Sequence, residues 1–217
     1  MEEELQGLPA EKHYNLTHFQ QRFNWDCGIS CVLMILSSTH RAEFLQNFNK
    51  ICEDEGFGSS TWTIDLCYIL KRFQVHHEYF TKTLGVDPNY NKHSYYTQII
   101  DKDEKRIIKK FKEAKAHGLH VEKRTVALQV LLRHLAQHGP VIVLTNASLL
   151  TCEVCKRNVL EKIRHSLPQL NIKLISSFKM FATVPLNPWM PLGKLMVLTR
   201  ILSLYLITRF NSNIPKI

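Results

Sequence analysis

The fold is decided by residues 20–36, which read Gln20-Gln21-Arg22-Phe23-Asn24-Trp25-Asp26-Cys27-Gly28-Ile29-Ser30-Cys31-Val32-Leu33-Met34-Ile35-Leu36. Apolar side chains recur in this stretch at the i, i+3, i+4, i+7 spacing of a buried helix face, at Ile29, Val32, Leu33 and Leu36. Asp is a favoured N-cap residue, and Asp26 directly precedes the apolar run. The pattern therefore predicts a buried helix with Asp26 as N-cap and Cys27 as its first residue.

Cys27 is a candidate nucleophile because of its predicted place at a helix start. The N–H groups of a first turn and the helix dipole favour an anion, which raises the thiolate fraction of a cysteine there. Gln21, six residues upstream, is a candidate donor to the oxyanion that forms when a thiolate attacks a carbonyl. The other interpretation is that Cys27 is a small core residue, as we expect for Cys31 one turn further on.

Outward from this helix, periodicity predicts a mixed chain. We expect helices at residues 41–52, 62–73, 95–116 and 127–137, and strands at 75–83 and 120–126. Residues 141–145 form a short continuous apolar run, which is typical of a central buried strand. The predicted fold class is α+β, with helices packed on a small sheet.

Charge divides the chain unevenly. The chain has 217 residues, 45% of them hydrophobic, and a net charge of +9. All of this excess lies in residues 156–217, since that segment holds ten Lys and Arg side chains against the single acid Glu161. We therefore expect an N-terminal segment at 1–17, a domain at 18–155 and a divergent basic tail at 156–217.

The sequence also indicates where the protein resides. The N-terminus lacks the layout of a secretory signal, and the apolar stretch at 195–208 is shorter than the ~20 residues of a membrane span. We expect a cytoplasmic protein without a membrane span and with reduced cysteines. Cys152 and Cys155 have the spacing of half a zinc site, to which only His165 stands near as a further ligand.

Charged residues in the middle of the chain suggest no special chemistry. Asp65 is expected to be an exposed acid in the first turn of its helix, where the dipole stabilises it. A basic run is interleaved with acids and is expected to be a solvated helix face, without nucleic-acid binding; its members are Lys105, Arg106, Lys109, Lys110, Lys112 and Lys115.

Several motifs together resemble one known family, the guanylyl cyclase domain-containing proteins. They lie in a consistent order between residues 18 and 155: Gln20-Gln21, Trp25-Asp26-Cys27-Gly28, Trp62-Thr63-Ile64-Asp65-Leu66, Thr83-Leu84-Gly85-Val86-Asp87, Val121-Glu122-Lys123 and the Cys152/Cys155 pair. That family includes plant proteins described as soluble guanylyl cyclases. The resemblance implies a papain-like, C39 peptidase-like fold with Cys27 as nucleophile and Gln21 as oxyanion donor.

The chain departs from the family pattern after Cys155. The family continues with a Gly-His before an apolar strand, whereas here the basic tail follows. The resemblance therefore implies an incomplete domain without its general-base His, as in an alternative isoform or a truncated paralogue. Residues 141–145 would then keep an unpaired edge. We expect a catalytically impaired protein that acts through an unknown protein partner.

An active enzyme is the alternative hypothesis, either a guanylate cyclase that converts GTP to cyclic GMP or a cysteine hydrolase. GTP enters only through the resemblance, because the sequence contains neither a GxGxxG nor a GxxxxGK phosphate loop. No cofactor is expected.

Overall fold

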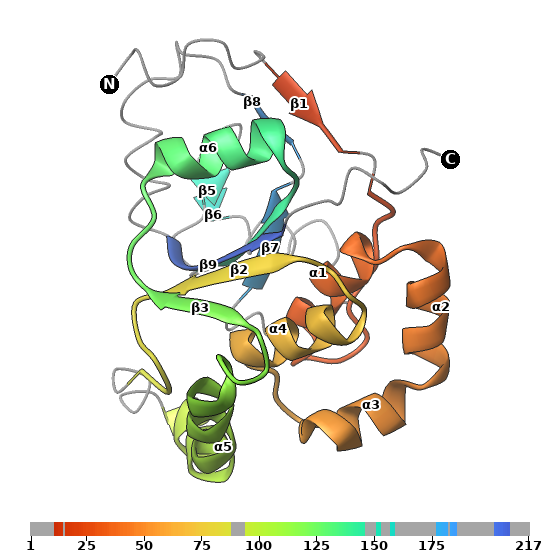
Figure 1. The fold of residues 1–217 in the computed structure, drawn as a ribbon, viewed down its shortest axis with the longest axis vertical. Coiled ribbons are helices and arrows are strands. Elements are labelled where there is room, and N and C mark those ends of the chain that lie inside the picture. Colours follow the sequence, from red (N-terminus) through yellow and green to blue (C-terminus); the bar gives the residue numbers. More distant parts are fainter. Residues whose placement is uncertain are drawn as a thin grey trace.

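A five-stranded sheet with helices on both faces organises the molecule (Figure 1). The computed structural model describes residues 11–14, 16–87 and 94–145, and five short strand segments at 151–152, 157–158, 177–181, 183–185 and 202–208. The elements in the first 87 residues are β1 (Glu11–His13), α1 (Cys27–Ile35), α2 (Ser38–Gln46), α3 (Phe48–Glu55), α4 (Thr63–Arg72) and β2 (His77–Thr81). Those that follow are α5 (Ser94–Glu113), β3 (His120–Lys123), α6 (Leu128–Gln137), β4 (Val141–Thr145), β5 (Thr151–Cys152), β6 (Arg157–Asn158), β7 (Ser177–Phe181), β8 (Thr183–Pro185) and β9 (Leu202–Thr208).

The strand order of the main sheet is β3-β2-β9-β4-β7. Only β2 and β3 are parallel, and α5 forms the crossover between them. Every other pairing in this sheet is antiparallel. The predicted α+β class is confirmed, as helices pack on a small sheet.

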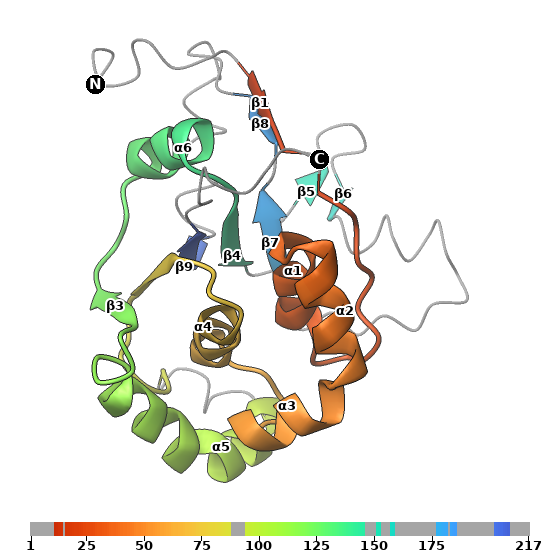
Figure 2. The ribbon, with the colours of Figure 1, turned by 45° about the vertical axis from the view of Figure 1, so that its right-hand side comes forward.

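The sheet separates two apolar clusters. Figure 2 shows α6 on one side of the sheet and α1 and α4 on the other. Successive residues of β4 alternate between the clusters: Ile142 packs with the α1 and α4 side chains, while Val141 and Val143 pack with Leu131 and Leu135 of α6. This alternation is the period of two of a strand, and burial on both faces explains why β4 is apolar from Val141 to Leu144.

Most predicted elements are confirmed, but one predicted helix is two. The helix expected at 41–52 is divided into α2 and α3 at Asn47. Ser37 starts α2 early by accepting a hydrogen bond from the His40 N–H, at 3.2 Å. The Asn47 side chain donates to the Glu43 carbonyl at 3.0 Å, which offers the backbone an alternative partner and favours the break.

The prediction that β4 keeps an unpaired edge is wrong. Both edges are paired, with β7 on one side and β9 on the other. These two strands come from beyond residue 156, so the sheet combines segments from both sides of the change in composition. The division of the chain at residue 155 stays a prediction. Among the described residues, no helix is long and apolar enough to cross a membrane.

A buried carboxylate joins the helices on the α4 side of the sheet. Asp65 is 0% exposed, so the prediction of an exposed acid is wrong. Its Oδ1 accepts from Arg106 Nη1 at 2.5 Å and from Lys110 Nζ at 2.8 Å, and its Oδ2 accepts from the Trp62 N–H at 2.9 Å. Two members of the basic run on α5 therefore point inward, which corrects the prediction of a wholly solvated face.

Asp103 is a second buried carboxylate, and it lies beside Asp65. Its Oδ2 accepts hydrogen bonds from the Ser60 hydroxyl and from Trp62 Nε1, the latter at 2.8 Å. Arg106 Nη2 lies 3.4 Å from the same oxygen. Together, Asp65 and Asp103 hold α5 against α4 and against the loop that precedes α4.

The position of β9 predicts slow amide exchange. Because β9 is paired on both sides, its backbone N–H groups are bonded to β2 or β4, and opening them requires the sheet to separate. We expect strong protection at residues 202–208 in hydrogen exchange read by mass spectrometry, with the exposed loop at Gly58 and Ser59 exchanging fast as the internal reference. Exchange of the β9 amides at the rate of that loop would contradict the topology.

The contacts of Asp65 predict that neutralising its side chain greatly lowers the free energy of unfolding. Asp65→Asn leaves Arg106 and Lys110 without their shared buried counter-charge, which typically costs about 3–5 kcal/mol. The matched control is Asp101→Asn, an exposed acid on α5, which should change the free energy of unfolding by less than about 0.5 kcal/mol. Denaturant unfolding followed by circular dichroism measures both. Equal stability of the two variants would show that Asp65 does not hold the helices together.

Candidate functional site

Cys27 lies where the sequence predicts it, as the first residue of α1. Asp26 is in the N-cap position, but its carboxylate makes no cap hydrogen bond. It turns back instead, accepting from the N–H groups of Arg22 at 3.1 Å and Phe23 at 3.0 Å. Asp26 thus folds the loop at 22–26 against the helix start and does not take the first-turn N–H groups that favour an anion.

Exposure distinguishes Cys27 from the other cysteines whose side chains the structure describes. Cys27 is half-buried, whereas Cys31, Cys52 and Cys67 are buried. Burial raises the pKa of Cys31 to about 12 and that of Cys52 to about 11, and it raises the pKa of Cys67 well above its usual value. These three remain protonated core thiols, which confirms the prediction for Cys31.

The Gln21 side chain forms a hydrogen bond within its own loop. Its amide Nε2 donates to the Phe23 carbonyl at 2.8 Å, so this donor has to leave that carbonyl before it can serve an oxyanion at Cys27. The role of Gln21 as oxyanion donor stays a prediction, as does that of Cys27 as nucleophile.

Of the Cys152 and Cys155 pair, the structure describes Cys152, which lies in β5 where this strand pairs antiparallel with β6. The backbone register places Cys152 opposite Arg157. Cys155 and His165 lie outside the described residues. Within the described residues, no group of three His, Cys, Asp or Glu is arranged to hold a metal ion. The zinc site stays a prediction.

Aromatic rings of the loop that precedes Cys27 and of α3 form a platform. Phe23 and Trp25 stack with their ring centres 5.4 Å apart and their planes within 6°, and Phe48 of α3 joins the stack at 6.2 Å from Phe23. The guanidinium of Arg22 lies 4.6 Å from the centre of the Phe48 ring. Phe23 is 45% exposed, and the platform borders a hollow of about 540 Å³ that reaches Ser60 and Asp103.

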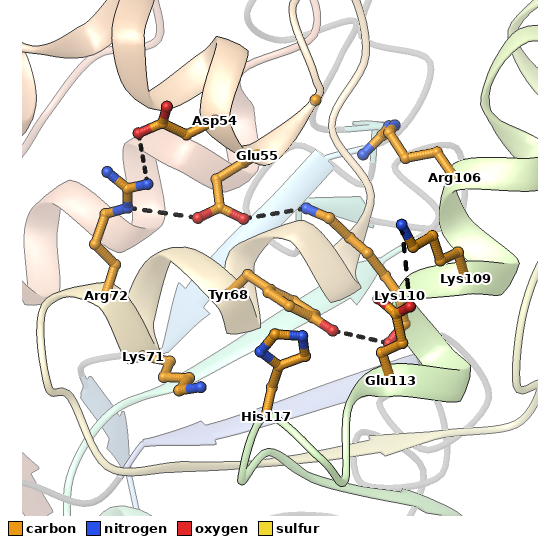
Figure 3. A pocket seen from close by; sticks show the side chains of 11 residues that line it. Asp54, Glu55, Tyr68, Lys71, Arg72, Arg106, Lys109, Lys110, Glu113 and His117 are labelled. Atoms are coloured by element: carbon orange, nitrogen blue, oxygen red, sulfur yellow. Dashed lines mark hydrogen bonds and ion pairs between the residues drawn. The ribbon is translucent and has the colours of Figure 1, made fainter.

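A second cavity, of about 570 Å³, lies between α3, α4 and α5, and we call it the basic pocket (Figure 3). Its lining residues are Asp54, Glu55, Gly56, Tyr68, Lys71, Arg72, Arg106, Lys109, Lys110, Glu113 and His117. Glu55 lies between Arg72 and Lys110, and the Tyr68 hydroxyl donates to the Lys110 carbonyl at 3.0 Å.

The basic pocket was not predicted from the sequence, although the sequence of α5 carries a signal for it. Arg106, Lys109, Lys110 and Glu113 follow the i, i+3, i+4, i+7 spacing of one helix face. Alternating charge along that face favoured a solvated surface. Only the packing of α5 on α4 shows that the face is a pocket wall.

Comparisons with known proteins agree on one family. A family model described as guanylylate cyclase matches residues 16–174. The plant protein "Guanylyl cyclase 1" of Arabidopsis thaliana is 35% identical over 123 residues, which cover 56% of this chain and 43% of that protein. The chain therefore spans less than half the length of this curated relative. No solved structure gives a significant match. Since the family model covers most of the chain, the chain belongs to the guanylylate cyclase family.

Proposed function

We propose that this family member carries a papain-like thiol site at Cys27 and Gln21, lacks the general-base His of such a site, and acts by binding a protein partner. The observation that carries the proposal is the placement of a half-buried cysteine as the first residue of a buried helix. A thiol in that position is favoured as thiolate by the helix start.

The surroundings of the thiol favour impaired catalysis. The Gln21 amide is bonded within its loop, and several histidine rings contact residues other than Cys27. These are His40 against Phe73, His77 against the Val75 carbonyl, His117 against Tyr68, His120 against Phe80, and His134 against His138. Burial also lowers the pKa of His77. A papain-like site needs a general base for efficient catalysis, because proton transfer contributes typically 10²–10⁴-fold to such reactions.

The aromatic platform supports a role in binding. Phe23 exposes an apolar ring beside the loop that carries Gln21 and Asp26, and Arg22 lies against the same stack. Aromatic and Arg side chains are enriched at the centres of protein interfaces. A partner that covers Phe23 would therefore also cover the approach to the loop before Cys27.

A guanylate cyclase is the second candidate, favoured by the family description and by the name of the plant relative. Cyclisation of GTP usually requires a divalent metal held by carboxylates. The three buried carboxylates in the described part of the chain are all engaged. Asp65 is bonded to Arg106, Lys110 and Trp62, Asp103 to Ser60 and Trp62, and Asp26 to the N–H groups of Arg22 and Phe23. A cysteine hydrolase is the remaining form of the active-enzyme hypothesis, and it needs a base at Cys27.

The engaged carboxylates predict no cyclase activity. The purified chain, incubated with GTP and Mg²⁺ or Mn²⁺, should form no cyclic GMP above a heat-treated control, as measured by mass spectrometry of the nucleotides. Metal-dependent product that disappears with a chelator would replace the proposal by the cyclase hypothesis.

The thiol site predicts selective labelling. With iodoacetamide at pH 8, Cys27 should react far faster than Cys31, because a pKa of about 12 leaves only about one in ten thousand Cys31 thiols ionised. Peptide mass spectrometry measures the rate at each cysteine, and Cys27→Ser removes the fast signal. The chain should show no amidase turnover. Turnover that Cys27→Ser abolishes would show a complete catalytic site and contradict the impaired thiol site.

A further inference from the structure

The aromatic platform lines the hollow of about 540 Å³, which we call the aromatic hollow. Its apolar wall consists of Phe23, Trp25, Phe48 and Phe57. Trp25 and Phe57 meet edge to face with their ring centres 6.4 Å apart, so that the fourth ring joins the other three. Phe57 is buried, whereas Phe23 exposes its ring. An exposed aromatic ring at the border of a cavity favours a partner that brings an apolar side chain.

Arg22 adds a cation to this surface. Its guanidinium lies 4.6 Å from the centre of the Phe48 ring and 5.7 Å from that of Phe23. Its side chain is exposed and makes no ion pair with the residues that the structure describes. The backbone N–H of Arg22 is fixed on the Asp26 carboxylate. A guanidinium that stacks on aromatic rings still has N–H donors at the edge of its plane, where they match the two oxygens of a carboxylate.

Lys102 of α5 is a second cation at the aromatic hollow. It lines the cavity, its side chain is exposed, and its Nζ donates to the Ser59 hydroxyl at 3.2 Å. Within the described part of the chain, Lys102 also lacks an ion pair. An ammonium group has three donors, so this hydrogen bond leaves two of them for a ligand.

The acids of the wall do not balance both cations. Asp103 is buried, and its Oδ2 accepts hydrogen bonds from Ser60 and Trp62. Glu53 is exposed and has no ion pair to the described residues. Two available cations thus meet one available acid. The charge of the surface therefore favours an acidic partner over a basic one.

We propose that the aromatic hollow binds an acidic segment of a protein partner, in which an aromatic side chain is flanked by carboxylates. The inference rests on the proposed function, because it states the chemistry of the partner that the platform binds. The aromatic side chain of the partner packs on Phe23, and its carboxylates bind Arg22 and Lys102. Aromatic rings supply the contact area, and the charges select acidic segments and exclude basic ones.

The test is calorimetric titration of the full chain with a short peptide, Gly-Asp-Phe-Asp-Gly, blocked at both ends. The peptide should bind, with an affinity that falls as the salt concentration rises. The blocked peptides Gly-Asn-Phe-Asn-Gly and Gly-Asp-Ala-Asp-Gly, which lack the charges or the ring, should bind at least about fivefold more weakly. Equal binding of the three peptides, or no binding of the first, would overturn the proposal.

GTP serves as a competitor in the same titration. It should not displace the acidic peptide. Displacement by GTP would show that the aromatic hollow is a nucleotide site, and would overturn the assignment to a protein segment.

Charge variants test the contacts with opposite signs. Arg22→Gln should weaken peptide binding by about fivefold, whereas Glu53→Gln, which removes the available acid of the wall, should strengthen it by about twofold. Lys102→Gln should weaken binding by about threefold, and its matched control Lys105→Gln, also exposed on α5 but outside the wall, by less than about twofold. Losses of the same size in all four variants would overturn the proposal.

An apolar pair of variants tests the ring. Phe23→Ala should weaken peptide binding by about tenfold. Val130→Ala is the matched control, since Val130 is 44% exposed but lies on α6, and it should leave the affinity unchanged. Melting curves check that every variant folds. Unchanged affinity in a folded Phe23→Ala variant would contradict the role of the platform.

Labelling of Cys27 and binding of the peptide are independent measurements, so the failure of one proposal is distinct from that of the other. Absence of peptide binding, with fast labelling of Cys27 and no turnover, would overturn this inference and leave the impaired thiol site in place. Peptide binding together with turnover at Cys27 would contradict the impaired thiol site and support the assignment of the aromatic hollow.

Discussion

The arrangement of helices on one face of the sheet depends on the shared ion pair of Asp65 with Arg106 and Lys110. A carboxylate taken fully out of water is tolerated only when cations and hydrogen-bond donors surround it, and α5 supplies both cations. The pair fixes which face of α5 meets α4. It thereby turns Lys109 and Glu113 toward the space under Tyr68, so that the basic pocket is a consequence of how the buried charge is neutralised.

The thiol site rests on a different local constraint. The Asp26 carboxylate is used to close the loop on Arg22 and Phe23, which leaves the start of α1 without a side-chain cap. An uncapped helix start is a suitable place for an anion. The same loop exposes Phe23 to solvent. The turn at residues 22–26 therefore positions both the start of α1 with Cys27 and the aromatic platform.

Local pattern was enough to predict the start of α1 at Cys27, the helix α4 and the buried strand β4, since each is set by spacing within a few residues. Burial of Asp65 could not be read from its own helix, because its partners lie on α5, a separate element. The hydrogen bond that the Gln21 side-chain amide donates to the Phe23 carbonyl was not predicted, for the opposite reason. This partner lies only two residues away and competes with the longer reach to Cys27 that the spacing suggested. The pairing of β4 with β7 and β9 was not predicted, because pairing between distant segments produces no periodic pattern in the sequence of either segment.

The place of β9 between β2 and β4 has a consequence for how the chain is made. Phe80 and Val143 both face Tyr205 across the sheet, and the segment containing Tyr205 is synthesised long after the other two. Until it emerges from the ribosome, β2 and β4 each present a backbone edge without its native neighbour. Folding of this sheet therefore depends on contacts between distant segments, which slows it and leaves these strand edges uncovered during that interval.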